Sequence, residues 1–163
     1  MSAKEARPTK HVVGPVRDFP PGSQSLVHVN GRPIAVFNVD GTFYALFNRC
    51  PHEGGPLCSG HVTGWLSSPG PGRYDYHPEH KVVRCPWHGW EYDLKTGQSW
   101  TDPETSRVRS YRVEVESGEA LQAAVEGGPP GAVPGPYVAE TIPVSVEDDY
   151  VVLDLSRQQS DRD

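Results

Sequence analysis

The sequence has few cysteines, no long apolar run and no excess of positive charge. Its 163 residues contain three cysteines, an odd number that argues against a disulfide scaffold and leaves metal or redox chemistry open. No apolar stretch approaches the roughly 20 residues needed to span a bilayer, and the N-terminal residues lack the apolar core of a signal peptide. We therefore expect a cytoplasmic protein with no membrane segment.

The charge balance argues against a nucleic-acid partner. Acidic residues outnumber basic ones by 21 to 15, which gives a formal net charge of −6. Nucleic-acid-binding domains usually carry a basic patch, and no basic cluster stands out in this sequence. An acidic surface suits an encounter with a basic protein partner, and it suits plain solubility equally well.

Short strands separated by tight turns dominate the sequence pattern. The chain contains 17 glycines and 17 prolines, and Asn30-Gly31 and Asp40-Gly41 are dipeptides that favour two-residue hairpin turns. Apolar, β-branched runs of strand length lie beside these turns, as in residues 34–39. The pattern predicts one all-β domain, a small antiparallel sandwich or open barrel with at most one short helix.

Two segments interrupt the alternating pattern. Residues 61–80 are rich in Gly, Pro, Ser, Tyr and His and are expected to form a long surface loop. Residues 118–137 form a second insert, whose first part favours a short helix and whose Pro-Gly-rich part ends it. Residues 1–19 are expected to be a loose N-terminal arm with a lead-in strand, and 156–163 a polar tail. The domain itself is then expected to span residues 20–155.

Two short segments each place a cysteine close to a histidine. One residue separates Cys50 from His52, and two residues separate Cys85 from His88. In both segments a proline follows the cysteine, a predicted strand comes before it, and glycine comes after the histidine. Two loops of this design at one end of a β-fold would offer two thiolates and two imidazoles to one site.

Three kinds of site use such ligands. Structural zinc takes four thiolate or imidazole ligands in a tetrahedron. A Rieske [2Fe–2S] cluster has one iron held by two cysteines and the other by two histidines. A single cysteine–histidine pair can instead be a nucleophile and its base.

The spacing and the glycines favour the iron–sulfur cluster. Zinc modules usually have two to four residues between paired ligands and often carry the histidines on a helix, whereas Cys50 and His52 have one residue between them. Glycines crowd both loops, as expected where backbone N–H groups must approach bridging sulfides closely. A nucleophile and its base would not need a second pair of the same design.

Both segments together resemble the Rieske iron–sulfur family. The stretches CPHEGGPLCSG and CPWHGWEYDLKTG match its pattern C-x-H … C-x-x-H, most closely that of soluble Rieske ferredoxins and of the Rieske domains of bacterial oxygenases. The resemblance covers about residues 20–155, with cluster loops at 50–60 and 85–93. It implies two packed antiparallel sheets with a small cluster-binding β subdomain.

The resemblance also implies which residues hold the cluster. Cys50 and Cys85 would ligate one iron of a [2Fe–2S] cluster, and His52 and His88 would ligate the other. The residues expected to surround these ligands are Gly54, Gly55, Trp87, Gly89, Trp90 and Tyr92.

Some positions depart from relatives found in cytochrome bc complexes. Those relatives join their two cluster loops by a disulfide, at positions that are Gly55 and Trp87 here. A serine hydroxyl that bonds their cluster is replaced by Trp90, whereas Tyr92 stands at the position of their tyrosine. Because hydroxyl groups aimed at sulfur raise the potential, we expect a low-to-intermediate value within the Rieske range of about −150 to +300 mV.

The remaining cysteine and histidines are given structural interpretations. Cys58 is expected to be a small buried residue or an exposed thiol rather than a ligand. Asp75, His77 and His80 lie close in sequence, as in the two-histidine, one-carboxylate iron sites of oxygenases. They fall in the predicted surface loop, and the chain lacks the large catalytic domain that such a site needs.

The family resemblance implies a one-electron carrier without catalysis of its own. Its partners would be a reductase and a terminal oxygenase or another oxidoreductase. Two alternatives stay open from the sequence: a small Rieske subunit of a multi-subunit oxygenase or nitrite-reductase-like enzyme, and an iron–sulfur redox sensor.

Overall fold

The fold is known from a computed structural model that describes residues 10–51, 54–87, 89–99, 107–123, 137–138 and 147–155. Within these residues the chain is built mainly of strands, with a single α-helix of six residues. The elements in chain order are β1 (Lys10–Pro15), η1 (Val16–Asp18), β2 (Gln24–Val29), β3 (Arg32–Val39), β4 (Thr42–Phe47), η2 (Leu57–Ser59), β5 (His61–Gly70), β6 (Arg73–Arg84), β7 (Glu91–Asp93), β8 (Ser110–Ser117), α1 (Gly118–Ala123), β9 (Tyr137–Val138) and β10 (Asp149–Asp154).

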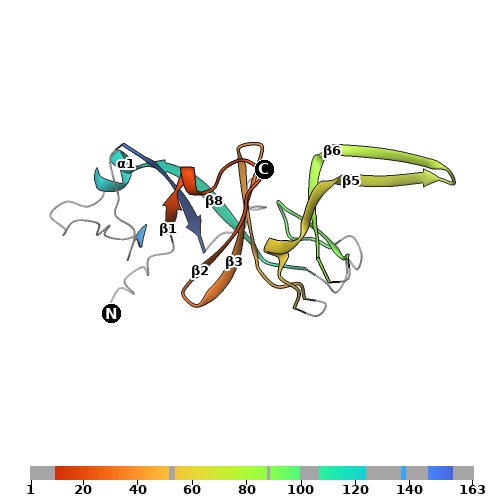
Figure 1. The fold of residues 1–163 in the computed structure, drawn as a ribbon, viewed down its shortest axis with the longest axis horizontal. Coiled ribbons are helices and arrows are strands. Elements are labelled where there is room, and N and C mark those ends of the chain that lie inside the picture. Colours follow the sequence, from red (N-terminus) through yellow and green to blue (C-terminus); the bar gives the residue numbers. More distant parts are fainter. Residues whose placement is uncertain are drawn as a thin grey trace, which may run out of the picture.

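The strands form two sheets of unequal size (Figure 1). The larger sheet has seven strands in the order β2-β3-β4-β8-β10-β1-β9, and the smaller has three in the order β5-β6-β7. Neighbouring strands are antiparallel, except that β1 and β9 pair in parallel. The predicted all-β class and the mainly antiparallel pairing are therefore confirmed.

The predicted hairpin turns are present at both dipeptides. Asn30 and Gly31 have φ values of 53° and 75°, and Asp40 and Gly41 have values of 52° and 92°. Positive φ at both central residues matches the right-handed twist of the adjoining strands, and Asn, Asp and Gly tolerate it best. These turns fix the register of β2 on β3 and of β3 on β4, with Val29 opposite Arg32 and Val39 opposite Thr42.

Strand β3 is buried on both faces, which explains its unbroken apolar run. Ile34 and Val36 pack into a core formed within the large sheet, together with residues of β8 and β10. Ala35 and Phe37, which alternate with them, point into a second core that joins the large sheet to β6 and β7. This second core contains both predicted cysteine ligands, so packing between the sheets positions the candidate site.

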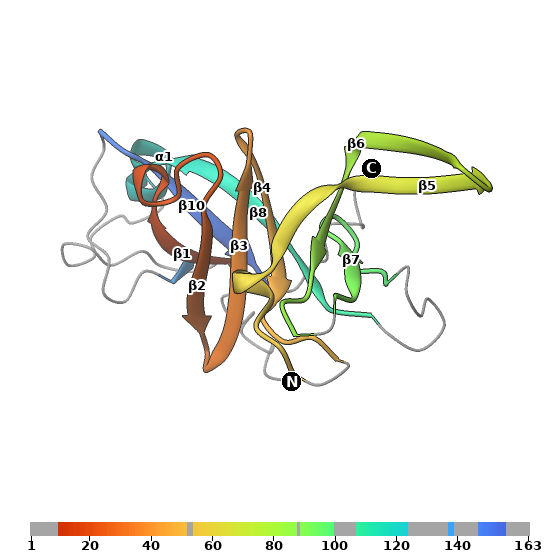
Figure 2. The same cartoon turned by 45° about the vertical axis from the view of Figure 1, so that its right-hand side comes forward.

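Residues 61–80 do not form the predicted surface loop. They belong to β5 and β6, which pair as a hairpin of residues 61–84 that we call the long hairpin. Its outer part extends away from the rest of the described chain in two views (Figures 1 and 2). Strand β7 pairs only with residues 82–84, so the outer part of this hairpin has no third strand among the described residues. Three prolines and three glycines in residues 61–80 hid the strand pattern, and register shifts interrupt its alternation.

The N-terminal segment and the second insert each contain a short described element. Residues 10–15 form the lead-in strand, which lies between β10 and β9 in the large sheet. The second insert begins with α1, and its residues 124–136 lie outside the described chain. Among the described residues, no helix has the length and apolar character to cross a membrane.

Candidate metal centre

The two cysteine loops have the same backbone hydrogen bonds. In the first loop the Gly54 amide donates to the Cys50 carbonyl at 2.7 Å, and the Cys50 amide donates to the Gly55 carbonyl at 2.8 Å. In the second loop the corresponding bonds run from the Gly89 amide to the Cys85 carbonyl, at 2.9 Å, and from the Cys85 amide to the Trp90 carbonyl, at 2.7 Å. Positions 50, 54 and 55 therefore correspond to positions 85, 89 and 90.

Each loop needs a glycine at its fifth position. Gly54 has φ of +84° and Gly89 has φ of +75°, a left-handed conformation that costs other residues roughly 1–2 kcal/mol each. This residue reverses the chain just after the predicted histidine ligand. The glycines that the sequence placed near the ligands thus have a demonstrable backbone role at these two positions.

The two predicted cysteine ligands lie in the core between the sheets. Cys50 is 1% exposed and Cys85 is 2% exposed, and both belong to the same apolar group as Val83 and Leu94. All three cysteines of the chain are described, and they form no disulfide. Burial beside apolar side chains gives two thiolate donors a low-dielectric setting that suits metal binding more than solvent-exposed chemistry.

Gly55 brings the first loop against the second. A Cβ atom on Gly55 would lie 2.6 Å from the Cys85 sulfur and 3.1 Å from Cγ of Trp87. No side chain other than hydrogen fits that space, and Gly55 itself is buried. Gly55 and Trp87, which the resemblance places at the disulfide positions of some relatives, are therefore neighbours here.

Tyr92 connects strand β7 to the first loop. Its hydroxyl lies 3.1 Å from the Cys50 sulfur, and its side chain is fully buried. Burial, followed by the hydrogen bond to Cys50 and the charges of both cysteines, raises the pKa of Tyr92 well above its ordinary value. The hydroxyl therefore keeps its proton, and toward a metal-bound thiolate it can only donate. Its effect on the potential of a cluster stays a prediction.

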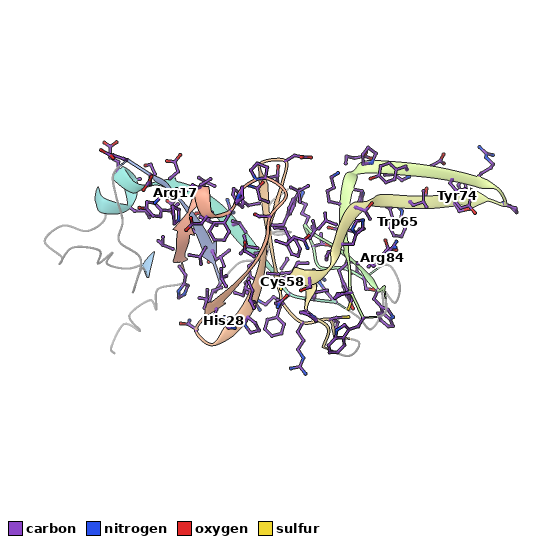
Figure 3. The ribbon with its side chains drawn as sticks, in the orientation of Figure 1. Arg17, His28, Cys58, Trp65, Tyr74 and Arg84 are labelled. Carbon is purple, nitrogen blue, oxygen red and sulfur yellow. The ribbon has the colours of Figure 1, made fainter. Side chains whose placement is uncertain are left out.

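The two tryptophans of the second loop have different surroundings. Trp87 is 56% exposed, whereas Trp90 is partly buried and packs against the core that holds the cysteines. Trp90 therefore covers the inner side of the loop, and Trp87 lies at the protein surface beside Gly55. Arg84, which comes just before this loop, is labelled near the base of the long hairpin in Figure 3.

His52 and His88 lie outside the described residues. Their neighbours Pro51, Gly54, Trp87 and Gly89 are described, and all of these except Gly54 are exposed. Within the described part of the chain, no group of three or more His, Cys, Asp and Glu side chains could hold a metal ion. The ligating role of the two histidines thus stays a prediction.

The residues set aside in the sequence take structural positions. Cys58 has a structural position. Its amide donates to Asn48 Oδ1 and its carbonyl accepts from the Gln24 side chain, and these bonds hold η2 against the large sheet. Figure 3 shows it near the start of the long hairpin. His77 lies 3.0 Å from the Ser67 hydroxyl, and His80 contacts Asp93 rather than Asp75. A two-histidine, one-carboxylate site is not formed by these described side chains.

One contact of the site region was missed from the sequence. His80 Nε2 lies 3.0 Å from Oδ2 of Asp93, and the Asp93 side chain is only 7% exposed. The other oxygen, Oδ1, accepts the amides of Lys95 and Thr96 at 2.8 and 3.0 Å. The motif Asp-x-x-Thr-Gly signals this turn, because an aspartate commonly bonds the amides that follow it. Nothing local to the sequence signals that His80 reaches it.

The described residues fit a [2Fe–2S] cluster. Two buried sulfurs, a glycine against one of them and a buried hydroxyl at the other form a cradle that a side chain on Gly55 would fill. Two thiolates with two imidazoles from the same loops are the donor set of a Rieske centre.

Comparisons with known proteins agree with this donor set. Residues 9–112 match the family model of the Rieske [2Fe-2S] domain. The ferredoxin subunit of 3-phenylpropionate/cinnamic acid dioxygenase from Escherichia coli K12 is 32% identical over 116 residues, which cover 71% of this chain and 93% of that protein. The ferredoxin component of the naphthalene 1,2-dioxygenase/salicylate 5-hydroxylase systems of a Ralstonia species is 29% identical over 100 residues, covering 61% and 81%.

Solved structures show the same fold. The ferredoxin of carbazole 1,9a-dioxygenase from Nocardioides aromaticivorans IC177 superposes with a TM-score of 0.50 at 25% identity, covering 65% of this chain and 88% of that one. The ferredoxin structure, the family match and the paired cysteine loops agree on one assignment. The chain belongs to the Rieske [2Fe–2S] domain family.

Proposed function

We propose that this protein is a one-electron carrier, the ferredoxin component of an oxygenase system, which passes electrons from a reductase to a terminal oxygenase. The observation that carries the proposal is the pair of equivalent loops that close on each other around two buried cysteines. The curated relatives named above are ferredoxin components of dioxygenase systems, and they support the same role.

In this proposal Cys50 and Cys85 hold one iron, and His52 and His88 hold the other. The bound [2Fe–2S] cluster supplies reversible one-electron redox chemistry. The cysteines lie on the buried side, and the histidines belong to the loop segments whose described neighbours are exposed. That division would leave the histidine side of the site facing a partner protein.

The surrounding residues hold the site and exclude water from its inner side. Trp90 and the apolar core lie behind the cysteines, while the Tyr92 hydroxyl donates toward the Cys50 sulfur. A hydrogen bond to sulfur stabilises the more negative, reduced state and so raises the potential. With one such hydroxyl and tryptophan at the serine position, the expected potential lies in the low-to-intermediate part of the Rieske range.

The carrier role proposed here rests on the site itself, in which two buried cysteine sulfurs and a buried tyrosine hydroxyl form a cradle for a redox cofactor. We place the protein in the cytoplasm, in support of which the described chain has three cysteines without a disulfide.

Two measurements test the proposal. If the four proposed ligands hold one [2Fe–2S] cluster, the purified protein should contain two irons and two sulfides per chain. After reduction with dithionite it should give the electron paramagnetic resonance signal of a Rieske centre. Bound zinc with a silent spectrum would overturn the cluster assignment.

A second test addresses the partner. The protein should be reduced by an NADH-dependent flavoprotein reductase and should reoxidise when a terminal oxygenase with its substrate is added. A stable complex that co-purifies with a larger iron protein would instead support a permanent oxygenase subunit.

A further inference from the structure

Strand β7 presents its two faces to different partners. It has three residues and pairs with β6 through Val82–Asp93, Val83–Tyr92 and Arg84–Glu91. Tyr92 faces the core and reaches the Cys50 sulfur, as Val83 opposite it faces the same core. Asp93 points to the other face, because successive residues of a strand alternate. A strand this short depends on its ends for a fixed position.

The end of β7 is held by Asp93. Its backbone amide donates to the Gln98 carbonyl at 2.9 Å and its carbonyl accepts from the Gly97 amide at 2.7 Å. Its carboxylate accepts two further amides of the turn through Oδ1. The second oxygen, Oδ2, is the one that contacts His80. The carboxylate therefore joins the turn after β7 to the long hairpin.

His80 is well placed to hold this carboxylate. It lies where the pairing of β6 with β5 shifts, between His77 opposite Trp65 and Lys81 opposite Gly64, and from there its ring reaches Asp93 Oδ2 at 3.0 Å. The next backbone contact also comes from the long hairpin, since the Leu94 amide donates to the Lys81 carbonyl at 3.0 Å. The ladder between β6 and β7 is thus continued past its last pair by two contacts.

We propose that His80 and Asp93 are positioning residues for the redox centre: the pair fixes β7 and thereby keeps the Tyr92 hydroxyl on the Cys50 sulfur. The long hairpin supplies His80, so this segment takes part in setting the reduction potential. The inference rests on the proposed function, because it assumes that Cys50 is a ligand of the cluster.

The test is a double-mutant cycle read out as the midpoint potential. His80→Ala should lower the potential, by a large part of the fall that Tyr92→Phe causes alone. In the Tyr92→Phe background, His80→Ala should leave the potential unchanged, because the bond that it supports is already gone. An equal shift in both backgrounds would mean a through-space charge effect and would overturn the positioning role. No shift in the parent background would overturn it as well.

Two further variants separate this effect from loss of folding. Asp93→Asn keeps an oxygen for the Lys95 and Thr96 amides and removes the negative charge that faces His80. Loss of this charge alone would raise the potential, so the fall that we expect would come from the released strand, and a rise would count against the positioning role. His77→Ala is the matched control, because His77 is on the same strand and contacts Ser67 and Glu79 instead of Asp93. It should leave the potential at the parent value.

A readout without the cluster potential completes the test. Hydrogen exchange at the Lys95 and Thr96 amides should speed up in His80→Ala and stay unchanged in His77→Ala. Unaltered protection of these two amides from exchange in His80→Ala would contradict the role of the His80–Asp93 pair in fixing β7. If the parent protein lacks a Rieske resonance signal, the proposed function fails; if the signal is present and the cycle gives no shift, only this inference fails.

Discussion

The two cysteine loops share one backbone design and differ in what fills it. Both use an amide at the fifth position, a glycine in the left-handed conformation and a second bond at the sixth position. At that sixth position the first loop has Gly55, which touches the Cys85 sulfur, and the second has Trp90, which packs into the core. The shared backbone hydrogen bonds therefore place the two cysteines in the same way. The side chain at the sixth position then gives the loops different tasks, because Gly55 lets the first loop approach the second and Trp90 covers the core side of the second loop.

The largest effect is expected where the loops touch. In Gly55→Ala the new methyl group would meet the Cys85 sulfur and the Trp87 ring, and overpacking of this kind costs about 1–3 kcal/mol. Because the strain falls on a proposed ligand, we expect the purified variant to lose most of its iron and sulfide, as measured by metal and sulfide analysis. Gly70→Ala is the control, since nothing lies within 4 Å of its position. Full cluster content in Gly55→Ala would contradict the close approach.

The equivalence of the two loops can be tested at the fifth position. Gly54→Ala and Gly89→Ala should each lower the free energy of unfolding by about 1–2 kcal/mol, because both force alanine into positive φ. The atoms nearest to a new methyl group belong to the flexible side chains of Arg49 at Gly54 and of Arg84 at Gly89, so we expect similar costs at both positions. Urea unfolding measures both values.

A glycine outside the loops provides the control for this pair. Gly72 also has positive φ, of +72°, and nothing lies within 4 Å of it. Gly72→Ala should destabilise the chain similarly and leave cluster content unchanged. A cost confined to one of the two loops would show that their shared hydrogen bonds do not make them equivalent.

A smaller effect is expected from the hydroxyl that only the first loop is shown to receive. Tyr92→Phe keeps the buried ring and removes the donor to the Cys50 sulfur. If the bond is stronger in the reduced state by about 1 kcal/mol, the potential should fall by about 40 mV, since a tenfold change, about 1.4 kcal/mol, is 59 mV for one electron. Protein-film voltammetry measures the shift. An unchanged potential with an intact cluster would remove Tyr92 from the factors that set it.

Local sequence patterns were sufficient to predict the all-β class and the hairpin turns, whereas the ligand roles of the site residues stay predictions. The loop glycines, Tyr92 and the hairpin turns at residues 30–31 and 40–41 have signatures within a few neighbouring residues, so sequence reasoning could place them. The positions of Cys50 and Cys85 in one core followed from the paired motif and not from either half alone. The ligand roles of His52 and His88 stay predictions.

The long hairpin could not be predicted in the same way. This segment has Pro69 and Pro78 in its strands and Pro71 in its turn, together with several glycines, and these residues indicate breaks when a sequence window is considered alone. The two strands gain their structure by pairing with each other. Gly64 shows the reason for one of these glycines, because a Cβ there would lie 2.7 Å from the Tyr76 ring and the His77 carbonyl. The His80–Asp93 contact depends on that unpredicted register and was missed for the same reason.

The smallest effect on stability is expected from the residues on either side of the second loop. Arg84 and Glu91 flank this loop and form an ion pair of 3.6 Å, whereas the residue at the position equivalent to Glu91 in the first loop is Pro56. Because Arg84 is about half exposed, solvent and salt weaken the attraction, so Glu91→Gln should cost less than about 1 kcal/mol. The difference should shrink in concentrated salt when urea unfolding is repeated there. A larger loss of unfolding free energy that does not depend on salt would mean that Glu91 supports the second loop through contacts other than this ion pair. The two loops would then differ in the contacts at their ends as well as in the residue at their sixth position.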